Sequence, residues 1–310
     1  MTNPGFLLRS PAKLNWTLEV LGRREDGFHE LRSWFVAAAL YDELTCCPRA
    51  ASEVDAVTAT APHAALQVLG PAAKGVPVDA SNLVLRAEQA WRAAGGEAPP
   101  VSWSLQKYIP AGAGLGGGSG NAAAALRLLE VIGDGSAILD LPQLALTLGS
   151  DVPFFLQQEA AVLLGGRGEI LLATGTGPEG WVVLAVPSFP ISTGWVFAQL
   201  SNLPCVVGAC KESRIHVSVV PPLPLENDLL DAAERAYPAL QEFHAKLDAS
   251  ADFQLCGSGG TFFAYFPDFE TAENCAIQTR LVCAQVFVVS LQHGPILRAP
   301  MATPTAGRSS

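Results

Sequence analysis

The sequence has none of the marks of a membrane-spanning, secreted or zinc-binding protein. No uninterrupted apolar run approaches the roughly 18 residues that cross a bilayer. Residues 1–9 lack a basic segment followed by an apolar core, so no secretory signal is predicted. The seven cysteines form no C-x-x-C pair, and their odd number leaves one unpaired in any complete disulfide scheme. These absences predict a cytoplasmic protein with reduced thiols and no membrane partner.

Positive charge is also scarce. Lysine and arginine number 19 against 29 acidic residues, which gives a formal net charge of -10. Nucleic-acid-binding surfaces usually carry a basic patch or stripe, so we expect no nucleic-acid partner. A site for a phosphorylated ligand would therefore have to concentrate positive potential locally.

What the chain does have is enough apolar material for a folded core. It has 310 residues, of which 49% are hydrophobic and 15% charged. Near residues 155–160 the pattern changes to short strands and glycine-rich turns, which predicts a domain boundary. We expect domains at 1–157 and 158–297 and a disordered tail at 298–310.

Hydrophobic periodicity and turn residues predict the secondary structure. Helices are expected at 82–94, 122–132, 140–148, 227–237, 238–249 and 268–282. Strands are expected at 11–22, 31–45, 101–105, 161–164, 169–173, 181–186 and 285–290, with a strand, glycine turn and strand at 253–266. The stretch 48–80 is predicted to be hairpin and loop.

The most informative stretch runs from Lys107 to Asn121 and contains six glycines, at 112, 114, 116, 117, 118 and 120. It lies between a predicted strand and a predicted helix. Glycines let backbone N-H groups approach a ligand, and the free N-H groups and dipole of a helix N-terminus favour an anion. The stretch predicts a phosphate-binding loop, with a plain flexible connection as the alternative.

The loop alone does not choose its ligand. Gly112-x-Gly114-x-x-Gly117 satisfies the dinucleotide fingerprint, which needs an acidic residue about 20 positions later. Asp134 and Asp140 fall near that distance, but a helix end and a helix start already explain them. The Walker A pattern fails because Gly118 stands where its lysine should be.

Polar residues in apolar surroundings are the other candidates. Lys13 and Asn15 share the polar face of the strand at 11–22, where a solvated lysine is the simpler interpretation. Asp151 lies between a helix end and the apolar run 152–156, where it either caps a turn or has a chemical role. Local sequence leaves both alternatives open.

Phe28 and His29 follow the turn signal Asp26-Gly27. An aromatic ring beside an imidazole on a turn could hold a planar base. It could equally be a loop aromatic that folds onto the core beside a solvated histidine.

The string from Pro110 to Ala122 resembles the second motif of the GHMP kinase superfamily, Pro-x-x-x-Gly-Leu-Gly-Ser-Ser-x-Ala. Its triple-glycine form is similar to the 4-diphosphocytidyl-2-C-methyl-D-erythritol kinase family, and the resemblance covers roughly residues 10–292. Further segments follow that family's order: Pro11-Ala-Lys-Leu-Asn15, Gly22 to Leu31, Asn82-Leu-Val, Gly149-Ser-Asp-Val-Pro153, Glu226-Asn-Asp-Leu229 and Cys256 to Thr261.

The resemblance implies an α+β, two-domain GHMP kinase fold with its active site in the interdomain cleft. It implies an enzyme that uses ATP and Mg²⁺ to phosphorylate the 2-hydroxyl of a small cytidylyl substrate in isoprenoid precursor biosynthesis. By the same resemblance, Asp151 accepts the hydroxyl proton and Lys13 orients the hydroxyl and offsets negative charge.

The remaining roles are also carried over from the family. The expected ATP-binding residues are Pro110, Gly112, Gly114, Leu115, Gly116, Gly117, Gly118, Ser119 and Asn121. The expected substrate-binding residues are Asn15, Phe28, His29, Phe189 and Thr193, and Ser119 is a candidate Mg²⁺ contact.

The sequence departs from the family pattern in three places. Gly120 replaces a common Ser or Thr, Phe28 replaces Tyr, and 204–222 is longer than usual. The alternatives are another GHMP small-molecule kinase, a non-catalytic nucleotide-binding relative and, more distantly, a dinucleotide-dependent oxidoreductase. Oligomeric state is not predicted.

Overall fold

The computed structural model describes residues 5–49, 65–133, 139–200, 205–206, 225–247, 251–293, 296–297 and 300–303. Its strands are β1 (Phe6–Arg24), β2 (His29–Pro48), β3 (Ala65–Leu69), β4 (Val101–Gln106), β5 (Ala161–Gly166), β6 (Ile170–Gly175), β7 (Trp181–Val186), β8 (Cys205–Val206), β9 (Glu226–Asn227), β10 (Gln254–Leu255), β11 (Phe262–Phe266), β12 (Gln285–Ser290) and β13 (Met301–Ala302). Its helices are α1 (Leu83–Ala93), α2 (Gly117–Ile132), α3 (Leu141–Leu148), α4 (Val152–Phe155), α5 (Thr193–Phe197), α6 (Leu230–Ala236), α7 (Pro238–His244) and α8 (Phe269–Thr279). No helix among the described residues is long and apolar enough to span a bilayer.

The long antiparallel hairpin of β1 and β2 organises the larger sheet, whose main order is β13-β1-β2-β4-β3. One end of β2 pairs with β4 and the other end pairs with β5, which in turn pairs with β6. The hairpin therefore reaches from the glycine stretch, which follows β4, to the turn between β5 and β6.

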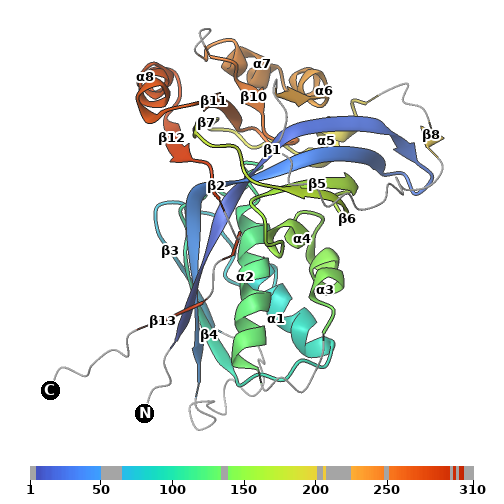
Figure 1. Cartoon of the computed structure of the whole chain (residues 1–310), viewed down its shortest axis with the longest axis vertical. Helices are drawn as coiled ribbons and strands as arrows, with labels where there is room; N and C mark the ends of the chain where they lie inside the picture. Colours follow the sequence, from blue (N-terminus) through green and yellow to red (C-terminus); the bar gives the residue numbers. More distant parts are fainter. Residues whose placement is uncertain are drawn as a thin grey trace, which may run out of the picture.

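Helices α1 to α4 lie against one face of this sheet, in the lower half of Figure 1. Helix α2 is the central one, and its residues from Ala122 to Leu126 are fully buried. They pack with Phe35 of β2 and Trp103 of β4 in one hydrophobic cluster. This burial fixes the N-terminal end of α2, and with it the end of the glycine stretch, against the sheet.

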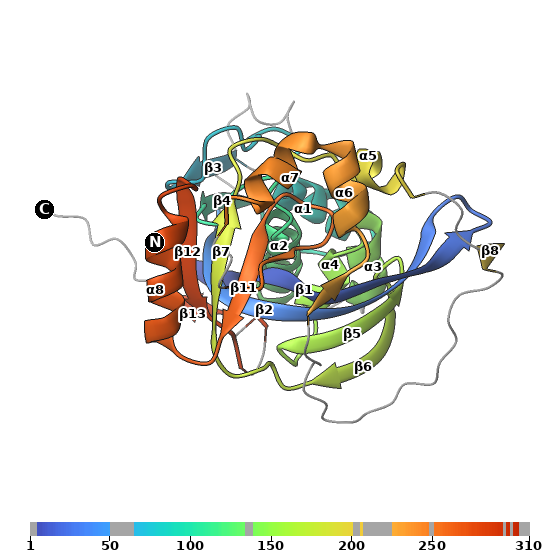
Figure 2. The same ribbon diagram turned by 90° about the horizontal axis from the view of Figure 1, so that it is seen from above.

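A second sheet, with the order β10-β11-β7-β12, lies above the first in Figure 1 and carries α6, α7 and α8. Figure 2, seen from above, shows β7, β11 and β12 crossing over the β1–β2 hairpin. Trp16 of β1 contacts Phe263 and Tyr265 of β11, with ring centroids 5.9 and 5.5 Å apart. Apolar contacts between the sheets thus hold the glycine turn that follows β10 over the glycine stretch that leads into α2. We call the turn after β10 the second glycine turn.

Most predicted elements are confirmed. Asn82 caps α1 by accepting from the N-H of Val84, and Gly95 ends the helix region with φ of 90°. Strands β7 and β12 have the predicted bounds. The α+β class is also confirmed, since the described chain mixes both element types.

Several boundaries differ from prediction, and two of the differences bear on the site. Helix α2 begins at Gly117 rather than Ala122, because Gly117, Gly118 and Gly120 form its first turn. Helix α6 begins at Leu230, because Asn227 instead pairs with β1 and its amide donates to the carbonyls of Leu255 and Gly257.

The domain division stays a prediction, and two features bear on it. Strands β5 and β6 belong to the larger sheet, so that sheet continues past residue 157. In the expected tail, Met301 and Ala302 pair with β1.

The stretch 48–80, which was expected to be hairpin and loop, contains β3, and β3 pairs in parallel with β4. Residues 50–64 lie outside the described residues, as does 204–222 except for β8.

Candidate active site

The glycine stretch forms a tight loop that leads directly into α2. Gly112, Gly114 and Gly116 all have positive φ, at 72°, 80° and 70°, which ordinary residues rarely adopt. The first helical bond of this end runs from the N-H of Gly120 to the carbonyl of Gly116. The N-H groups of the preceding helical residues have no intrahelical acceptor and are available to an anion.

A buried ion pair holds the start of this loop. Lys107 Nζ donates to Asp42 Oδ2 at 2.5 Å and to the carbonyl of Ile109 at 2.6 Å. The other carboxylate oxygen of Asp42 accepts from the N-H groups of Tyr108 and Ile109. Burial lowers the pKa of Lys107, and the adjacent Asp42 opposes that shift.

The ion pair also explains why Gly117 is required. A Cβ at that position would lie 2.7 Å from Lys107 Nζ. Sequence reasoning missed Asp42, because an acidic residue within a predicted strand gives no local sign of its partner 65 positions away.

The second glycine turn packs directly on the loop. A Cβ on Gly114 would lie 2.8 Å from the Cα of Gly259, so the two backbones touch. Thr261 Oγ1 donates to the carbonyl of Ala113 at 2.7 Å. The turn after β10 therefore braces the loop, whereas its sequence was equally compatible with a simple hairpin bend.

Lys13 and Asp151 come together beside this loop. Lys13 Nζ lies 3.5 Å from Asp151 Oδ2 and donates to Asn15 Oδ1 at 2.5 Å. The backbone N-H of Lys13 donates to the carbonyl of Leu115, which ties β1 to the loop. Lys13 is only 4% exposed, so it is not the solvated lysine that a half-polar strand suggests.

Asn15 is itself fixed. Its amide donates to Ser33 Oγ at 2.9 Å, and Ser33 Oγ donates to the carbonyl of Thr17. Asp151 precedes the short helix α4 and makes no side-chain cap hydrogen bond there. Its carboxylate remains partly open to solvent, so capping does not account for it.

Two cavities lie near Lys13, which lines the larger of the two. The smaller, of about 320 Å³, is lined by the loop and by residues from Gly75 to Leu83. All nine residues expected to bind ATP line it: Pro110, Gly112, Gly114, Leu115, Gly116, Gly117, Gly118, Ser119 and Asn121. Gly116 adjoins Lys13, since a Cβ there would lie 2.6 Å from Lys13 Cγ.

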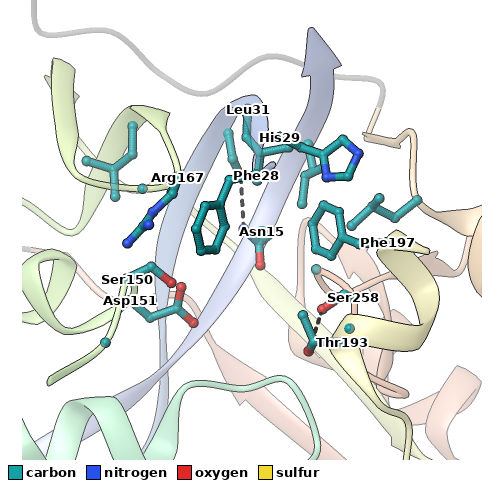
Figure 3. Close-up of a pocket in the computed structure, with 18 of the residues that line it drawn as sticks. Asn15, Phe28, His29, Leu31, Ser150, Asp151, Arg167, Thr193, Phe197 and Ser258 are labelled. Carbon is teal, nitrogen blue, oxygen red and sulfur yellow. Dashed lines mark hydrogen bonds between the residues drawn. The ribbon is translucent and has the colours of Figure 1, made fainter. Parts of the chain in front are cut away.

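The larger cavity, of about 950 Å³, has Lys13 in its lining and is shown in Figure 3. Five predicted residues besides Lys13 line it: Asn15, Phe28, His29, Asp151 and Thr193. Asp151 is the only carboxylate among the described residues that line either cavity. A hydroxyl group in this cavity would meet one acid and one buried amine at its boundary with the loop.

Aromatic residues gather at the outer end of the larger cavity. Phe28 is 52% exposed, and the His29 ring stacks on Phe197 with centroids 5.2 Å apart. Burial, followed by the charge of Arg23, lowers the pKa of His29, so the imidazole is neutral near pH 7. A neutral imidazole and exposed ring faces suit a planar base.

Phe189 is placed differently from the other predicted residues. It does not line either cavity, and its ring packs edge-on against Phe243 at 6.4 Å within the cluster of the second sheet. Phe197 of α5 lines the cavity instead, as does Arg167 of the β5–β6 turn. The local sequence did not mark either residue, because Phe197 lies within a short apolar run and Arg167 lies in a turn of glycine and charged residues.

Metal ligands are sparse in the described part of the chain. No group of three or more His, Cys, Asp or Glu side chains is arranged to hold an ion there. Mg²⁺ usually takes one or two carboxylates, several waters and substrate phosphates rather than an all-protein cage. Ser119 in the first turn of α2 and the single carboxylate Asp151 are compatible with that kind of site.

Comparison with known proteins agrees with this arrangement. Residues 82–159 match the family model for the GHMP kinases N terminal domain. The chain is 35% identical over 282 residues to the 4-diphosphocytidyl-2-C-methyl-D-erythritol kinase of Geobacter sulfurreducens, which covers 88% of this chain and 94% of that protein. It is also 35% identical over 275 residues to the enzyme of the same name from Pseudomonas syringae, covering 88% and 89%.

Solved structures give the same result. A crystal structure of 4-(cytidine 5'-diphospho)-2C-methyl-D-erythritol kinase aligns with a TM-score of 0.70 at 29% identity, covering 93% of this chain and 100% of that one. Homoserine kinase from Cytophaga hutchinsonii aligns with a TM-score of 0.60 at 14% identity, covering 96% and 97%, which shows the shared fold alone. The chain therefore belongs to the 4-diphosphocytidyl-2-C-methyl-D-erythritol kinase family of the GHMP kinases.

Proposed function

We propose that this protein transfers the γ-phosphoryl group of ATP to the 2-hydroxyl of 4-diphosphocytidyl-2-C-methyl-D-erythritol, a step in non-mevalonate isoprenoid precursor biosynthesis. The observation that carries this proposal is the Lys13–Asp151 pair. Both residues line the larger cavity, with Nζ and Oδ2 separated by 3.5 Å, and Lys13 adjoins Gly116 of the glycine-lined cavity, where a Cβ would lie 2.6 Å from Lys13 Cγ. A phosphate donor and an alcohol acceptor bound in the two cavities would meet there.

Asp151 is the proposed general base. It is the only carboxylate lining either cavity in the described part of the chain, and it is partly exposed on the acceptor side. The acceptor hydroxyl becomes nucleophilic as its proton passes to a carboxylate oxygen within hydrogen-bond reach. The resulting carboxylic acid then releases the proton to solvent, to which the side chain is partly open.

Lys13 is the proposed electrostatic partner. Its ammonium group is held by Asn15 and lies beside the ring of Phe35, 5.2 Å from the centroid. Because it is buried and already oriented, it needs little reorganisation to stabilise the negative charge that develops during transfer. It also orients the carboxylate of Asp151.

The loop and the start of α2 would hold the phosphates of ATP through backbone N-H groups. Phosphoryl transfer has a loose transition state, so positioning and charge neutralisation account for most of its catalysis. Mg²⁺ bound together with ATP would supply positive charge that offsets the charge of the phosphates. Ser119 would supply a hydroxyl contact to it from the first turn of α2.

The cytosine of the acceptor would lie among the aromatic residues at the outer end of the larger cavity. Phe28 presents an exposed ring for stacking, and neutral His29 can hydrogen-bond to the base edge. Phe197 takes the place that we first expected for Phe189, because it lines the cavity and stacks with His29. Thr193, bonded to Ser258, borders the same space.

The test follows ADP release by purified protein with ATP and Mg²⁺. The acceptors, supplied separately, are 4-diphosphocytidyl-2-C-methyl-D-erythritol, homoserine and mevalonate, with an acceptor-free reaction as background. We expect rapid ADP release with the cytidylyl compound alone. Turnover with homoserine or mevalonate but not with the cytidylyl compound would overturn the proposal and favour another GHMP kinase activity.

A further inference from the structure

An arginine that the proposed mechanism does not use lies in the acceptor cavity. Arg167 is in the turn between β5 and β6, and its guanidinium carbon lies 4.1 Å from the ring centroid of Phe28. In Figure 3 this pair occupies the side of the cavity that also carries Ser150 and Asp151, whereas Phe197 lies on the opposite side. Arg167 thus lines the cavity beside Phe28, which is expected to hold the base, and on the same side as Asp151.

A shared ion-pair network brings the two turns together. Arg24 pairs with Glu30 at 3.0 Å, with Asp26 at 3.3 Å and with Glu169 at 3.6 Å. Glu169 accepts from the backbone N-H of Arg167, and Asp26 accepts from the backbone N-H of Phe28. Through Glu169 and Asp26, the Arg24 side chain therefore holds the backbone of both Arg167 and Phe28.

In the part of the chain that the structure describes, the same network leaves the Arg167 guanidinium without an acidic partner. The three nearby carboxylates pair with Arg24, and within the described residues no ion pair involves the Arg167 side chain. Asp151 pairs with Lys13. An unneutralised guanidinium beside a ligand cavity is suited to an anionic ligand.

Stacking does not occupy the hydrogen-bonding groups of the arginine. A guanidinium that lies over an aromatic ring uses its face, and its N-H donors remain free around its edge. Those donors match two oxygens of a phosphate group in a bidentate arrangement. Phe28 would then contact both the acceptor base and the arginine that binds the phosphate.

We propose that Arg167 binds the diphosphate of the acceptor and so selects nucleoside diphosphate esters over uncharged nucleosides. This inference rests on the proposed function, because it assumes a cytidylyl acceptor in the larger cavity. The competing view is that Arg167 only supports the ring of Phe28. The two views differ in which ligands should bind more weakly after Arg167 is replaced.

The experiment measures competitive inhibition against the acceptor by cytidine, CMP and CDP, for the wild type and for Arg167→Ala. We expect the inhibition constant of CDP to rise by about 10- to 100-fold, the range for losing hydrogen bonds to a charged group. Cytidine should change by less than about two-fold, and the KM for ATP should stay unchanged. Arg167→Lys should give an intermediate loss, because it keeps the charge but not the planar fork.

Arg280→Ala is the matched control, since it removes the same charge from α8, which packs on the second sheet, where Arg280 pairs with Glu273. It should leave all three inhibition constants unchanged. Equal weakening of cytidine and CDP in Arg167→Ala would overturn the inference in favour of ring support alone, and an unchanged CDP constant would also overturn it. Either result with normal wild-type turnover leaves the proposed function standing, whereas a wild type that does not phosphorylate the cytidylyl acceptor refutes that function itself.

Discussion

At the scale of single residues, the role of Asp151 depends on its contacts in the folded protein rather than on its neighbours in sequence. Its neighbours in sequence suggested a capping aspartate, but the structure gives it no capping bond and puts it beside buried Lys13. We predict that Asp151→Asn lowers kcat by about 10²- to 10⁴-fold, the usual contribution of a general base. The KM values and the melting temperature should change little, because Asp151 is partly exposed and Lys13 keeps its hydrogen bond to Asn15.

The measurement is steady-state kinetics with thermal unfolding of the same preparations. Asp268→Asn is a suitable control, since Asp268 caps α8 through the N-H of Thr271 and lines neither cavity. A near-normal kcat in Asp151→Asn would falsify the general-base role.

His29 gives a residue-scale prediction about pH. Burial and then Arg23 hold its pKa below the ordinary value of 6.5, so the neutral imidazole persists below that pH. If the neutral form binds the base, the KM for the acceptor stays flat from pH 8 to 6.5 and rises only at lower pH. His29→Gln, which does not titrate, should remove that rise.

The KM for ATP serves as the internal reference in these profiles. An acceptor KM that already rises above pH 6.5 in the wild type, or an unaltered profile in His29→Gln, would count against this role for His29.

At the scale of elements, the buried pair of Asp42 and Lys107 holds the glycine loop to β2. Asp42 is fully buried and accepts hydrogen bonds from two backbone N-H groups at the start of the loop. Removing one member of a buried ion pair costs about 3–5 kcal/mol, because the other charge stays desolvated. We predict that Asp42→Asn lowers the free energy of unfolding by this amount and raises the KM for ATP.

The adjacent Glu43 provides the control. It pairs with Arg9 at 2.8 Å on the surface, and such pairs contribute less than about 1 kcal/mol. Urea unfolding of Asp42→Asn and Glu43→Gln tests the difference. Equal losses in the two variants would show that the buried pair does not anchor the loop.

At the scale of the whole molecule, the elements were predictable because their signals are local. Asn82 indicated the start of α1, and the alternating apolar residues Val101, Trp103 and Leu105 indicated β4. The start of α2 was missed because glycine has low helix propensity, while the tight packing of Gly117 on Lys107 and Ile109 overrides it.

The site was only partly predictable, for a related reason. Lys13, Phe28, His29 and Asp151 were found through a family resemblance, since each has an ordinary local interpretation. Phe197 and Arg167 depend on contacts between distant turns, and the Asp42–Lys107 pair joins residues 65 positions apart. A single sequence carries no sign of such pairings.

The contact between the two glycine turns joins the phosphate loop to the second sheet, and it gives a whole-molecule prediction. Gly112 and Gly114 both have positive φ, so alanine is strained by about 1–2 kcal/mol at either position. Only Gly114 has backbone in the way, because its Cβ would lie 2.8 Å from Gly259 Cα, whereas a Cβ on Gly112 meets nothing within 4 Å.

We therefore expect Gly112→Ala to lower the melting temperature slightly and kcat by only a few-fold. Gly114→Ala should push the loop and the second turn apart and lower kcat by about 10²-fold, the cost of misplacing reacting groups by about 1 Å. Gly259→Ala should reproduce this loss from the other side of the contact. Similar kcat values in Gly112→Ala and Gly114→Ala would mean that the second sheet does not help to shape the phosphate loop.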